Sequence, residues 1–384
     1  MVVLDPGSHT AYASFAQDDG SLFNSFRYMK ILYGVQSDGM GHALRSYAVI
    51  QYLISEGHTV KVVTSGRAFD FFRSHSIDVQ ELEGLSFYYH NNKVSYIMTG
   101  IKSIFNSPNV LKKCIIPLTQ IIIRYKPDLI ITDFELFSAK AWLLMDIPVI
   151  SIDNISLLFL TKLPYSLSTI TEYIIARFTA QGFIWWAHHY CVTSFFEAKL
   201  LHAEKDAERV TFVPPILRKE IIDVTPSQGN DIIVYQSTQT NKKLIPALHG
   251  CPDEQFIYYG GEEEKQDKNI CYKKFSTAKF ISDLASAKAV ITNGGFTLIG
   301  EAIFLHKPIL CNPIEKHYEQ FLNSEMVTKL GYGKAANDIS AEEIQVFVDE
   351  IPTFQKNLSQ YQQKGNEKLF EKLDTLLDAI QRKK

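Results

Sequence analysis

Short apolar, β-branched runs alternate with helix-like stretches along most of the chain. Lys30–Val35 precedes a glycine-containing loop and a predicted helix over about Ala43–Glu56, and Thr59–Thr64 is the next predicted strand. The further candidates Leu129–Thr132 and Val149–Ile152 are apolar almost throughout rather than at alternate positions. Continuous apolar strands are typical of a parallel sheet that helices cover on both faces. The alternation therefore predicts an α/β fold.

A second series of the same kind begins at Ile232–Tyr235. Its other strand candidates are Phe256–Tyr259, Ala289–Thr292 and Pro308–Leu310. Between the two series, the segment near Pro214 and over Thr225–Asn230 has the Pro, Ser, Gln, Gly and Asn composition of a linker. A chain of 384 residues that is 46% hydrophobic can build two cores. We therefore expect two doubly wound, Rossmann-like domains that face a central cleft at the carboxyl ends of their strands.

These features divide the chain into four parts. Residues 1–28 contain one basic residue and no apolar run, so they do not make a secretory signal. We expect them to form a poorly ordered extension, with the fold beginning at Met29. Residues 29–218 make the first predicted domain and residues 219–350 the second. Residues 351–384 are predicted as a charged helical segment.

Composition excludes several classes of function. The 39 basic and 42 acidic residues give a net charge of −3, which does not indicate a nucleic acid partner. The five cysteines are scattered and form no C-x-x-C pair, so neither a disulfide framework nor a structural zinc site is predicted. No segment has the ~18–20 uninterrupted apolar residues of a membrane-spanning helix. We therefore expect a cytoplasmic protein.

The loop after the first strand, Gln36–His42, offers a candidate catalytic base. Its glycines, Gly41 among them, let the backbone turn tightly and approach a ligand at the start of a helix. Leu44 stands where a dinucleotide-binding loop has its third glycine, so that motif is absent. A helix N-terminus favours the neutral form of His42, which is the form that a general base needs. A capping or purely structural histidine is the alternative.

Asp133 is the candidate partner of His42. It directly follows the predicted strand Leu129–Thr132, so it belongs at the same edge of the sheet as the His42 loop. A carboxylate there can accept the second ring N–H and stabilise the imidazolium that forms when the base takes a proton. Asp38 and Asp153, each at another strand end, are rivals for this role. An aspartate that only caps the following helix is the alternative.

The second series carries a candidate anion site. The strand Ala289–Thr292 leads into Asn293, Gly294, Gly295 and Thr297, where a helix begins. Free N–H groups at a helix N-terminus, together with a hydroxyl, suit a diphosphate.

Three polar side chains follow this anion site. The Glu301 carboxylate can accept hydrogen bonds from the vicinal hydroxyls of a ribose. Glu319 and Gln320, predicted at the start of the next helix, offer acceptors and a donor that suit sugar hydroxyls. This set of groups indicates a site for a nucleotide sugar.

These motifs resemble the donor-binding signature of GT-B glycosyltransferases. In that signature a glutamate follows the second glycine by six residues, as Glu301 follows Gly295, and the tail is similar to Glu319–Ser324. The opening Met29–His42 and the segment Pro127–Glu135 are similar to those of bacterial and archaeal members. The peptidoglycan N-acetylglucosaminyltransferase, the galactolipid galactosyltransferases and the UDP-glycosyltransferases are more distant relatives. The resemblance covers about residues 29–335.

The resemblance also assigns expected roles to residues. The Gly-His pair of the family supplies the catalytic base, which places that role on His42, assisted by Asp133. Many relatives have a histidine that contacts the diphosphate where this chain has Asn293, so the contact would here be a neutral hydrogen bond. The hydroxyls of Ser237 and Thr238, just after a predicted strand, could supply further phosphate contacts.

The function that the resemblance implies is inverting transfer of a hexose from a nucleoside diphosphate sugar, with UDP expected, to an acceptor hydroxyl. The nucleotide sugar would be a co-substrate, and no cofactor is expected. No D-x-D motif is present, which argues against a metal-bridged diphosphate. Two alternatives stay open: a non-hydrolysing nucleotide-sugar 2-epimerase and a catalytically silent nucleotide-sugar-binding protein.

The acceptor has no readable motif. The aromatic segment Phe183–Trp186 and the apolar run Leu157–Leu160 mildly favour a lipid-linked acceptor, with peripheral contact at the inner face of the membrane. Such an acceptor would fit synthesis of a cell-envelope glycan or a glycolipid. Helices packed in a domain core are the alternative for both segments.

Overall fold

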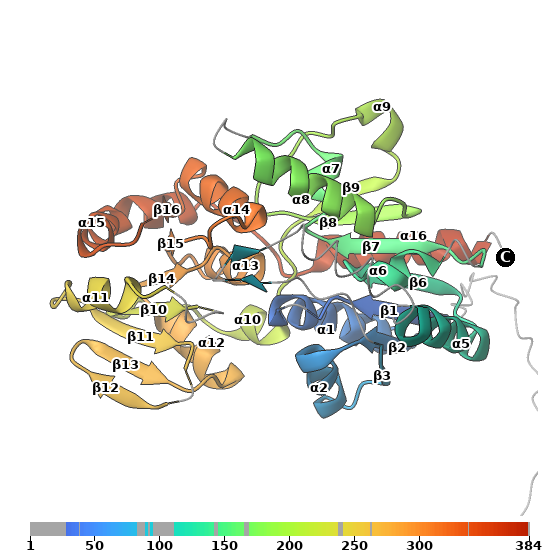
Figure 1. Cartoon of the computed structure of the whole chain (residues 1–384), viewed down its shortest axis with the longest axis horizontal. Helices are drawn as coiled ribbons and strands as arrows, with labels where there is room; N and C mark the ends of the chain where they lie inside the picture. Colours follow the sequence, from blue (N-terminus) through green and yellow to red (C-terminus); the bar gives the residue numbers. More distant parts are fainter. Residues whose placement is uncertain are drawn as a thin grey trace, which may run out of the picture.

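This computed structural model describes residues 28–37, 39–82, 89–90, 93–94, 111–141, 145–164, 169–236, 241–261, 263–336 and 338–382. The extension expected over residues 1–28 lies outside the described residues except for Tyr28. The described chain forms two sheets with helices around them, side by side in Figure 1. We call residues 30–223 the first half of the fold and residues 231–358 the second half.

The first half contains a seven-stranded sheet in the order β3-β2-β1-β6-β7-β8-β9, and every neighbouring pair in it is parallel. Its strands are β1 (Lys30–Val35), β2 (Thr59–Thr64), β3 (Val79–Glu81), β6 (Leu129–Asp133), β7 (Val149–Asp153), β8 (His189–Thr193) and β9 (Val210–Val213). Each strand predicted from an apolar run in this half is therefore present.

Helices cover both faces of this sheet. They are α1 (Met40–Ser55), α2 (Gly66–Ser74), α5 (Ile116–Tyr125), α8 (Ile170–Phe183) and α16 (Glu367–Arg382). Ile31 and Tyr33 of β1 join a core with α1, α2 and α16, whereas Leu32 joins the core with α5 and α8. Every residue of β6, β7 and β8 is buried, which is why these strands are mostly apolar instead of alternating between apolar and polar residues.

The second half contains a seven-stranded sheet in the order β12-β13-β11-β10-β14-β15-β16, parallel except for the β12–β13 pair. Its strands are β10 (Asp231–Tyr235), β11 (Gln255–Tyr259), β12 (Lys265–Asp267), β13 (Ile270–Lys273), β14 (Ala289–Thr292), β15 (Ile309–Cys311) and β16 (Gly333–Ala335). Its helices are α11 (Leu244–His249), α12 (Thr277–Ser286), α13 (Phe296–Phe304), α14 (Tyr318–Lys329) and α15 (Ala341–Leu358). The predicted fold class, two doubly wound α/β sheets, is confirmed.

The remaining elements of the described chain are short. They are η1 (Leu111–Ile115), α6 (Leu136–Ala139), α7 (Leu157–Leu160), α9 (Ala203–Asp206), α10 (Lys219–Asp223), β4 (Tyr89–His90) and β5 (Lys93–Val94). Of the helices in the described ranges, none combines the length and the apolar character needed to cross a membrane.

In both sheets the direction of winding reverses beside the first strand. The chain passes from β1 to β2 on one side and later returns as β6 on the other, so Val35 pairs in register with Asp133. In the second sheet β11 and β14 flank β10 in the same way, and Tyr235 pairs with Thr292. The loops after two such strands diverge, which creates the place where doubly wound sheets bind ligands.

The last two helices pack on different halves. Phe347 of α15 is buried in a core of the second half, whereas Leu373 of α16 is buried in the β1 core of the first half. Residues 359–366 connect the two helices, so the chain returns to the half in which it began (Figure 1). Pro352 lies inside α15, so this helix runs through the position near residue 351 where the helical segment was expected to begin.

We expect Leu373→Ala to destabilise the first half of the fold. Leu373 is fully buried, so its truncation leaves a cavity and should lower the free energy of unfolding by about 2–5 kcal/mol. Urea denaturation followed by circular dichroism measures the loss. Thr375→Ala, at an exposed position of the same helix, is the control. Equal stabilities of the two variants would show that α16 contributes nothing at Leu373.

Candidate functional site

The His42 and Asp133 side chains meet at the winding reversal of the first sheet. His42 lies in the first turn of α1, whose N-cap is Gly39, and Asp133 ends β6 beside β1. His42 Nδ1 is 2.8 Å from Asp133 Oδ1. Because a carboxylate at neutral pH only accepts hydrogen bonds, the ring nitrogen that faces it carries the proton. His42 Nε2 is then the unprotonated nitrogen that can take a proton from a substrate.

Of the two candidate partners that the structure describes, Asp133 contacts His42. Asp153 instead accepts hydrogen bonds from the Ser156 backbone N–H and from the hydroxyls of Ser151 and Ser156. Burial raises the pKa of the Asp153 carboxyl. Asp38 lies outside the described residues.

The Asp133 carboxylate is fully buried and has several partners. Arg45 Nε donates to Oδ2 at 2.7 Å, and the Ser46 hydroxyl donates to the same oxygen at 2.9 Å. Burial by itself would raise the pKa of the Asp133 carboxyl, but the charges and hydrogen bonds of Arg45 and His42 outweigh burial and hold this pKa well below its usual range. Asp133 is therefore a permanent negative charge beside the histidine.

The Gly294 loop lies at the winding reversal of the second sheet. Gly294 has a φ of 89°, which favours glycine, and a side chain there would collide with the Gln320 carbonyl oxygen. The Asn323 amide fixes the loop by donating to the Gly294 carbonyl at 3.0 Å. Gly295 is the N-cap of α13, and no side chain cap occupies its free N–H groups. Such an unoccupied helix N-terminus is suited to an anion.

Asn293, the expected phosphate contact, makes a hydrogen bond within the second half. Its Nδ2 donates to the Asn312 carbonyl at 3.1 Å, and its buried Oδ1 makes no hydrogen bond. One of the two amide hydrogens is therefore used within the second half, and a phosphate contact of Asn293 stays a prediction. Ser237 and Thr238, the other expected phosphate contacts, lie outside the described residues.

Glu301 is buried and paired with a residue that the sequence analysis missed. Arg218, from the segment between the two sheets, donates from Nε to Oε1 at 2.7 Å and from Nη2 to Oε2 at 2.8 Å. Each carboxylate oxygen keeps one lone pair for another donor. A single arginine in a linker carries no motif, so its position gave no sequence signal.

Glu319 and Gln320 lie in the first turn of α14. Gln320 Oε1 accepts a hydrogen bond from the Ile314 backbone N–H at 2.9 Å. Glu319 Oε1 accepts a hydrogen bond at 2.8 Å from Asn154 Nδ2, which belongs to the first half. Glu319 thus lies where the two halves of the fold touch.

The starts of α1 and α13 also touch. A Cβ atom on Gly41 would lie 2.7 Å from Thr297 Oγ1, which is closer than van der Waals contact allows. Gly41 and Thr297, both expected at the donor site, therefore meet across the boundary between the halves. The geometry brings His42, Asp133, Glu319 and the start of α13 to this one boundary.

A half-exposed aromatic ring at the edge of the second sheet is another feature that the sequence analysis missed. Phe275 is 50% exposed, and its ring centroid lies 6.1 Å from that of Tyr235 and 5.4 Å from that of Phe280. A flat apolar ring held in this way can stack on a planar ligand. A lone aromatic after two lysines has no periodicity, so the sequence gave no sign of it.

Comparison with known proteins identifies the chain. The sequence model of glycosyl transferase family 1 matches residues 29–352. The chain belongs to this family. A curated protein of Methanosarcina acetivorans, named as an uncharacterized glycosyltransferase, is similar to this glycosyltransferase. The two sequences are 23% identical over 326 residues, and the match covers 80% of this chain and 85% of the relative.

Solved structures show the fold of this glycosyltransferase. Arabidopsis thaliana UGT89C1 complexed with UDP-L-rhamnose has a TM-score of 0.65 at 15% identity and covers 92% of this chain and 99% of its own. CalG4, the calicheamicin glycosyltransferase, has a TM-score of 0.62 at 17% identity, with coverages of 92% and 99%. The predicted membership among GT-B glycosyltransferases is confirmed.

We expect Gly41→Val to force the two halves of this glycosyltransferase apart, because its side chain would occupy the space of Thr297. Misplacing the two halves by about 1 Å can lower the rate of glycosyl transfer by ~10²-fold. Small-angle scattering of the variant should give a larger radius of gyration than that of the unmodified protein. Initial-rate measurements should show the lower rate of glycosyl transfer. Gly182→Val is the control, because no atom lies near a Cβ at that position of α8. Normal rates in Gly41→Val would contradict the need for this close approach.

Proposed function

We propose that this glycosyltransferase transfers a sugar from a UDP-sugar to an acceptor hydroxyl with inversion at the anomeric carbon. The observation that carries this proposal is the 2.8 Å contact between His42 and Asp133. With Nδ1 bound to Asp133, Nε2 can remove the acceptor proton, and the carboxylate stabilises the imidazolium. The acceptor oxygen then attacks opposite the leaving diphosphate, which inverts the configuration.

The N-terminus of α13 is proposed to stabilise the leaving diphosphate. Its free N–H groups and the Thr297 hydroxyl face the boundary between the halves, close to Gly41. The partial positive charge of a helix N-terminus favours the negative charge that develops as the sugar–phosphate bond breaks. The reaction is proposed to need no metal ion and no cofactor, since this helix terminus can carry out the charge stabilisation.

The donor is proposed to lie along α13 and α14. Glu301 keeps a lone pair on each oxygen for ribose hydroxyls while Arg218 holds it in place. Glu319 and Gln320 would bind the sugar, which is proposed to be a hexose. The related structure of UGT89C1 is complexed with UDP-L-rhamnose, which supports UDP as the carrier. Phe275 would stack on the base.

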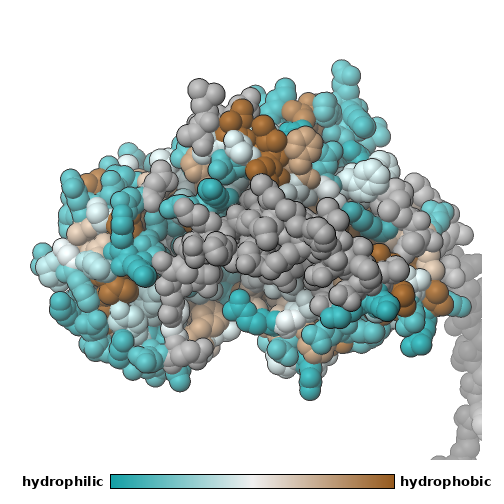
Figure 2. Space-filling model, in the orientation of Figure 1, coloured by the Kyte–Doolittle hydropathy of each residue, from teal (hydrophilic) through white to brown (hydrophobic). Residues whose placement is uncertain are grey.

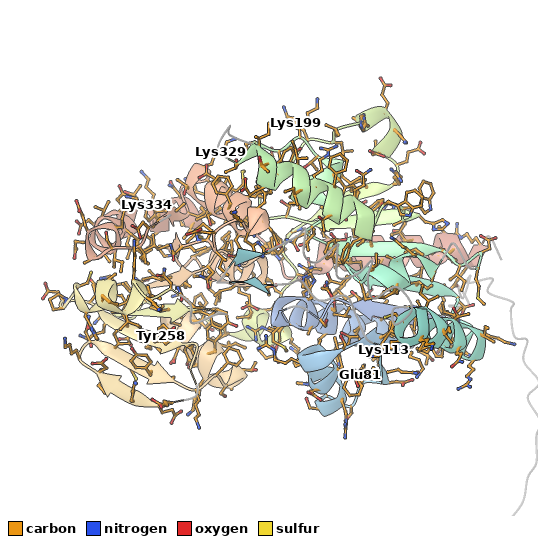
Figure 3. All side chains as sticks on the ribbon, in the orientation of Figure 1. Glu81, Lys113, Lys199, Tyr258, Lys329 and Lys334 are labelled. Carbon is orange, nitrogen blue, oxygen red and sulfur yellow. The ribbon has the colours of Figure 1, made fainter. Side chains whose placement is uncertain are left out.

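The acceptor is proposed to be lipid-linked and used at the inner face of the membrane in the synthesis of an envelope glycan or a glycolipid. Phe178 of α8 is 67% exposed and Trp185 after it is 54% exposed. Figure 2 shows hydrophobic side chains gathered on the side of the molecule where α8 lies. Lys199 and Lys329 are on this same side in Figure 3, and their charges suit anionic head groups.

Replacing the base tests the mechanism. We expect His42→Ala to lower turnover by ~10²-fold or more, because the acceptor hydroxyl loses the group that takes its proton. Donor affinity, measured by calorimetry, should change little. His75→Ala, at an exposed histidine, is the control. Unchanged turnover in His42→Ala would show that His42 is not the catalytic base.

Replacing Phe275 tests the donor site. A thermal-shift screen across nucleotide sugars should find that the cognate donor raises the melting temperature, because it binds the folded state alone. We expect Phe275→Leu to weaken donor binding by about tenfold, since a stacked base contributes ~1–3 kcal/mol. Leucine keeps most of the apolar volume and lacks the flat ring. Full donor stabilisation of Phe275→Leu would place the base elsewhere.

A further inference from the structure

Besides Asp133 of β6, an ionised side chain of α1 contacts the proposed base. Arg45 lies one turn after His42 and is only 3% exposed. Its Nε donates to Asp133 Oδ2 at 2.7 Å, and its Nη2 lies 2.8 Å from His42 Nδ1 while also contacting Asp133 Oδ1. The mechanism proposed above gives this arginine no role.

Asn154 holds the third nitrogen of the guanidinium. Arg45 Nη1 donates to Asn154 Oδ1 at 2.6 Å, and Asn154 Nδ2 donates to Glu319 at 2.8 Å. The amide accepts from the guanidinium through its oxygen and donates to the carboxylate through its nitrogen at the same time. Asn154 therefore fixes the position of Arg45 and connects it to the second half of the fold.

The charges of the three residues determine how readily His42 takes a proton. With Arg45 present, the group formed by buried Arg45, buried Asp133 and partly buried, neutral His42 has no net charge, and protonation of His42 makes it positive. Without Arg45, the same protonation would neutralise a buried negative charge. A net charge is costly in a buried setting, so Arg45 opposes protonation of His42.

We propose that Arg45 is a positioning residue that sets the orientation and the proton affinity of His42 through the carboxylate that both residues share. Its importance for catalysis rests on the proposed function of His42 as the base. Arg45 holds Asp133 with Oδ1 toward the histidine, and its charge keeps the imidazole neutral, as a base must be. Arg45 thus prevents the buried Asp133 from locking His42 in its protonated form.

Few other ionisable groups face this cluster. The charged and titratable side chains that interact with the group formed by His42, Asp133 and Arg45 in the described residues come from β1, β7 and α14, and they are Tyr33, Asp153 and Glu319. Burial raises the pKa values of Tyr33 and Asp153. The variants described below leave these three side chains in place.

The pH dependence of kcat/KM tests the proposal. In Arg45→Met the acidic limb of the profile should move to higher pH by about one to two units, because Asp133 then favours the protonated histidine. In Arg45→Lys, which keeps the positive charge, the limb should stay close to that of the unmodified enzyme. Arg209→Met removes an arginine–carboxylate pair at the far end of the sheet and should leave the limb unmoved. A uniform loss at every pH in Arg45→Met would reduce Arg45 to a structural role and overturn the proposal.

Variants of Asn154 provide a second test in case Arg45→Met fails to fold. Asn154→Asp keeps an acceptor for Arg45, loses the hydrogen bond to Glu319 and adds a negative charge that offsets Arg45, so the limb should move in the same direction by a smaller amount. Asn154→Leu removes the hydrogen bonds without adding charge, so it should lower kcat without moving the limb. If the acidic limb of the kcat/KM profile lay at the same pH in the two Asn154 variants, the electrostatic part of the proposal would be contradicted.

Nuclear magnetic resonance separates this proposal from the proposed function. Titration of the His42 ring in the unliganded protein should show its midpoint rising in Arg45→Met and in Asn154→Asp, whether or not the protein transfers a sugar. A risen midpoint together with full activity of His42→Ala would support control of His42 by Arg45 and overturn the base mechanism. An unmoved midpoint together with an inactive His42→Ala would support the mechanism and overturn the proposal for Arg45.

Discussion

The part of the site that belongs to the first half of the fold depends on a buried carboxylate. Asp133 ends an inner strand with no exposed surface, and a charge in that position costs several kcal/mol unless it is neutralised. His42, Arg45 and Ser46 all reach it from the first two turns of α1. The need to satisfy Asp133 therefore fixes how α1 sits on the sheet, and this in turn places the histidine.

The winding of the two sheets brings this group next to the second half of the fold. Each sheet reverses direction beside its first strand, so the helix α1 that follows β1 brings His42 next to Asp133 at the end of β6, while β14 leads into the Gly294 loop. Gly41 packs on Thr297, and Asn154 binds Glu319 across the boundary. Residues from both halves thus form a single site, although neither half contains all of it. The return of α16 to the first half ties the two sheets together.

Much of the site could be predicted because its residues follow local rules. His42 lies in the first turn of the helix that follows β1, Asp133 ends β6, and parallel neighbours bring such residues to one edge of the sheet. The sequence thus predicted a shared edge for these residues but left Asp38 and Asp153 as rivals of Asp133 for the contact with His42. Arg45 was missed because an arginine within an amphipathic helix ordinarily faces solvent, and only the burial of Asp133 draws it inward. Phe275 and Arg218 were missed because neither belongs to a periodic pattern.

The sequence by itself determined the strands, the two α/β halves, the glycosyltransferase resemblance and the residues at each strand end. These properties depend on local conformation and on hydrophobic pattern, and residues close together in the sequence determine both. Only the tertiary structure decided which aspartate binds His42, that Arg218 holds Glu301, and that Arg45 and Asn154 connect the base to Glu319. Those contacts join residues far apart in sequence, and they follow from the cost of burying charges that must find partners wherever the fold places them.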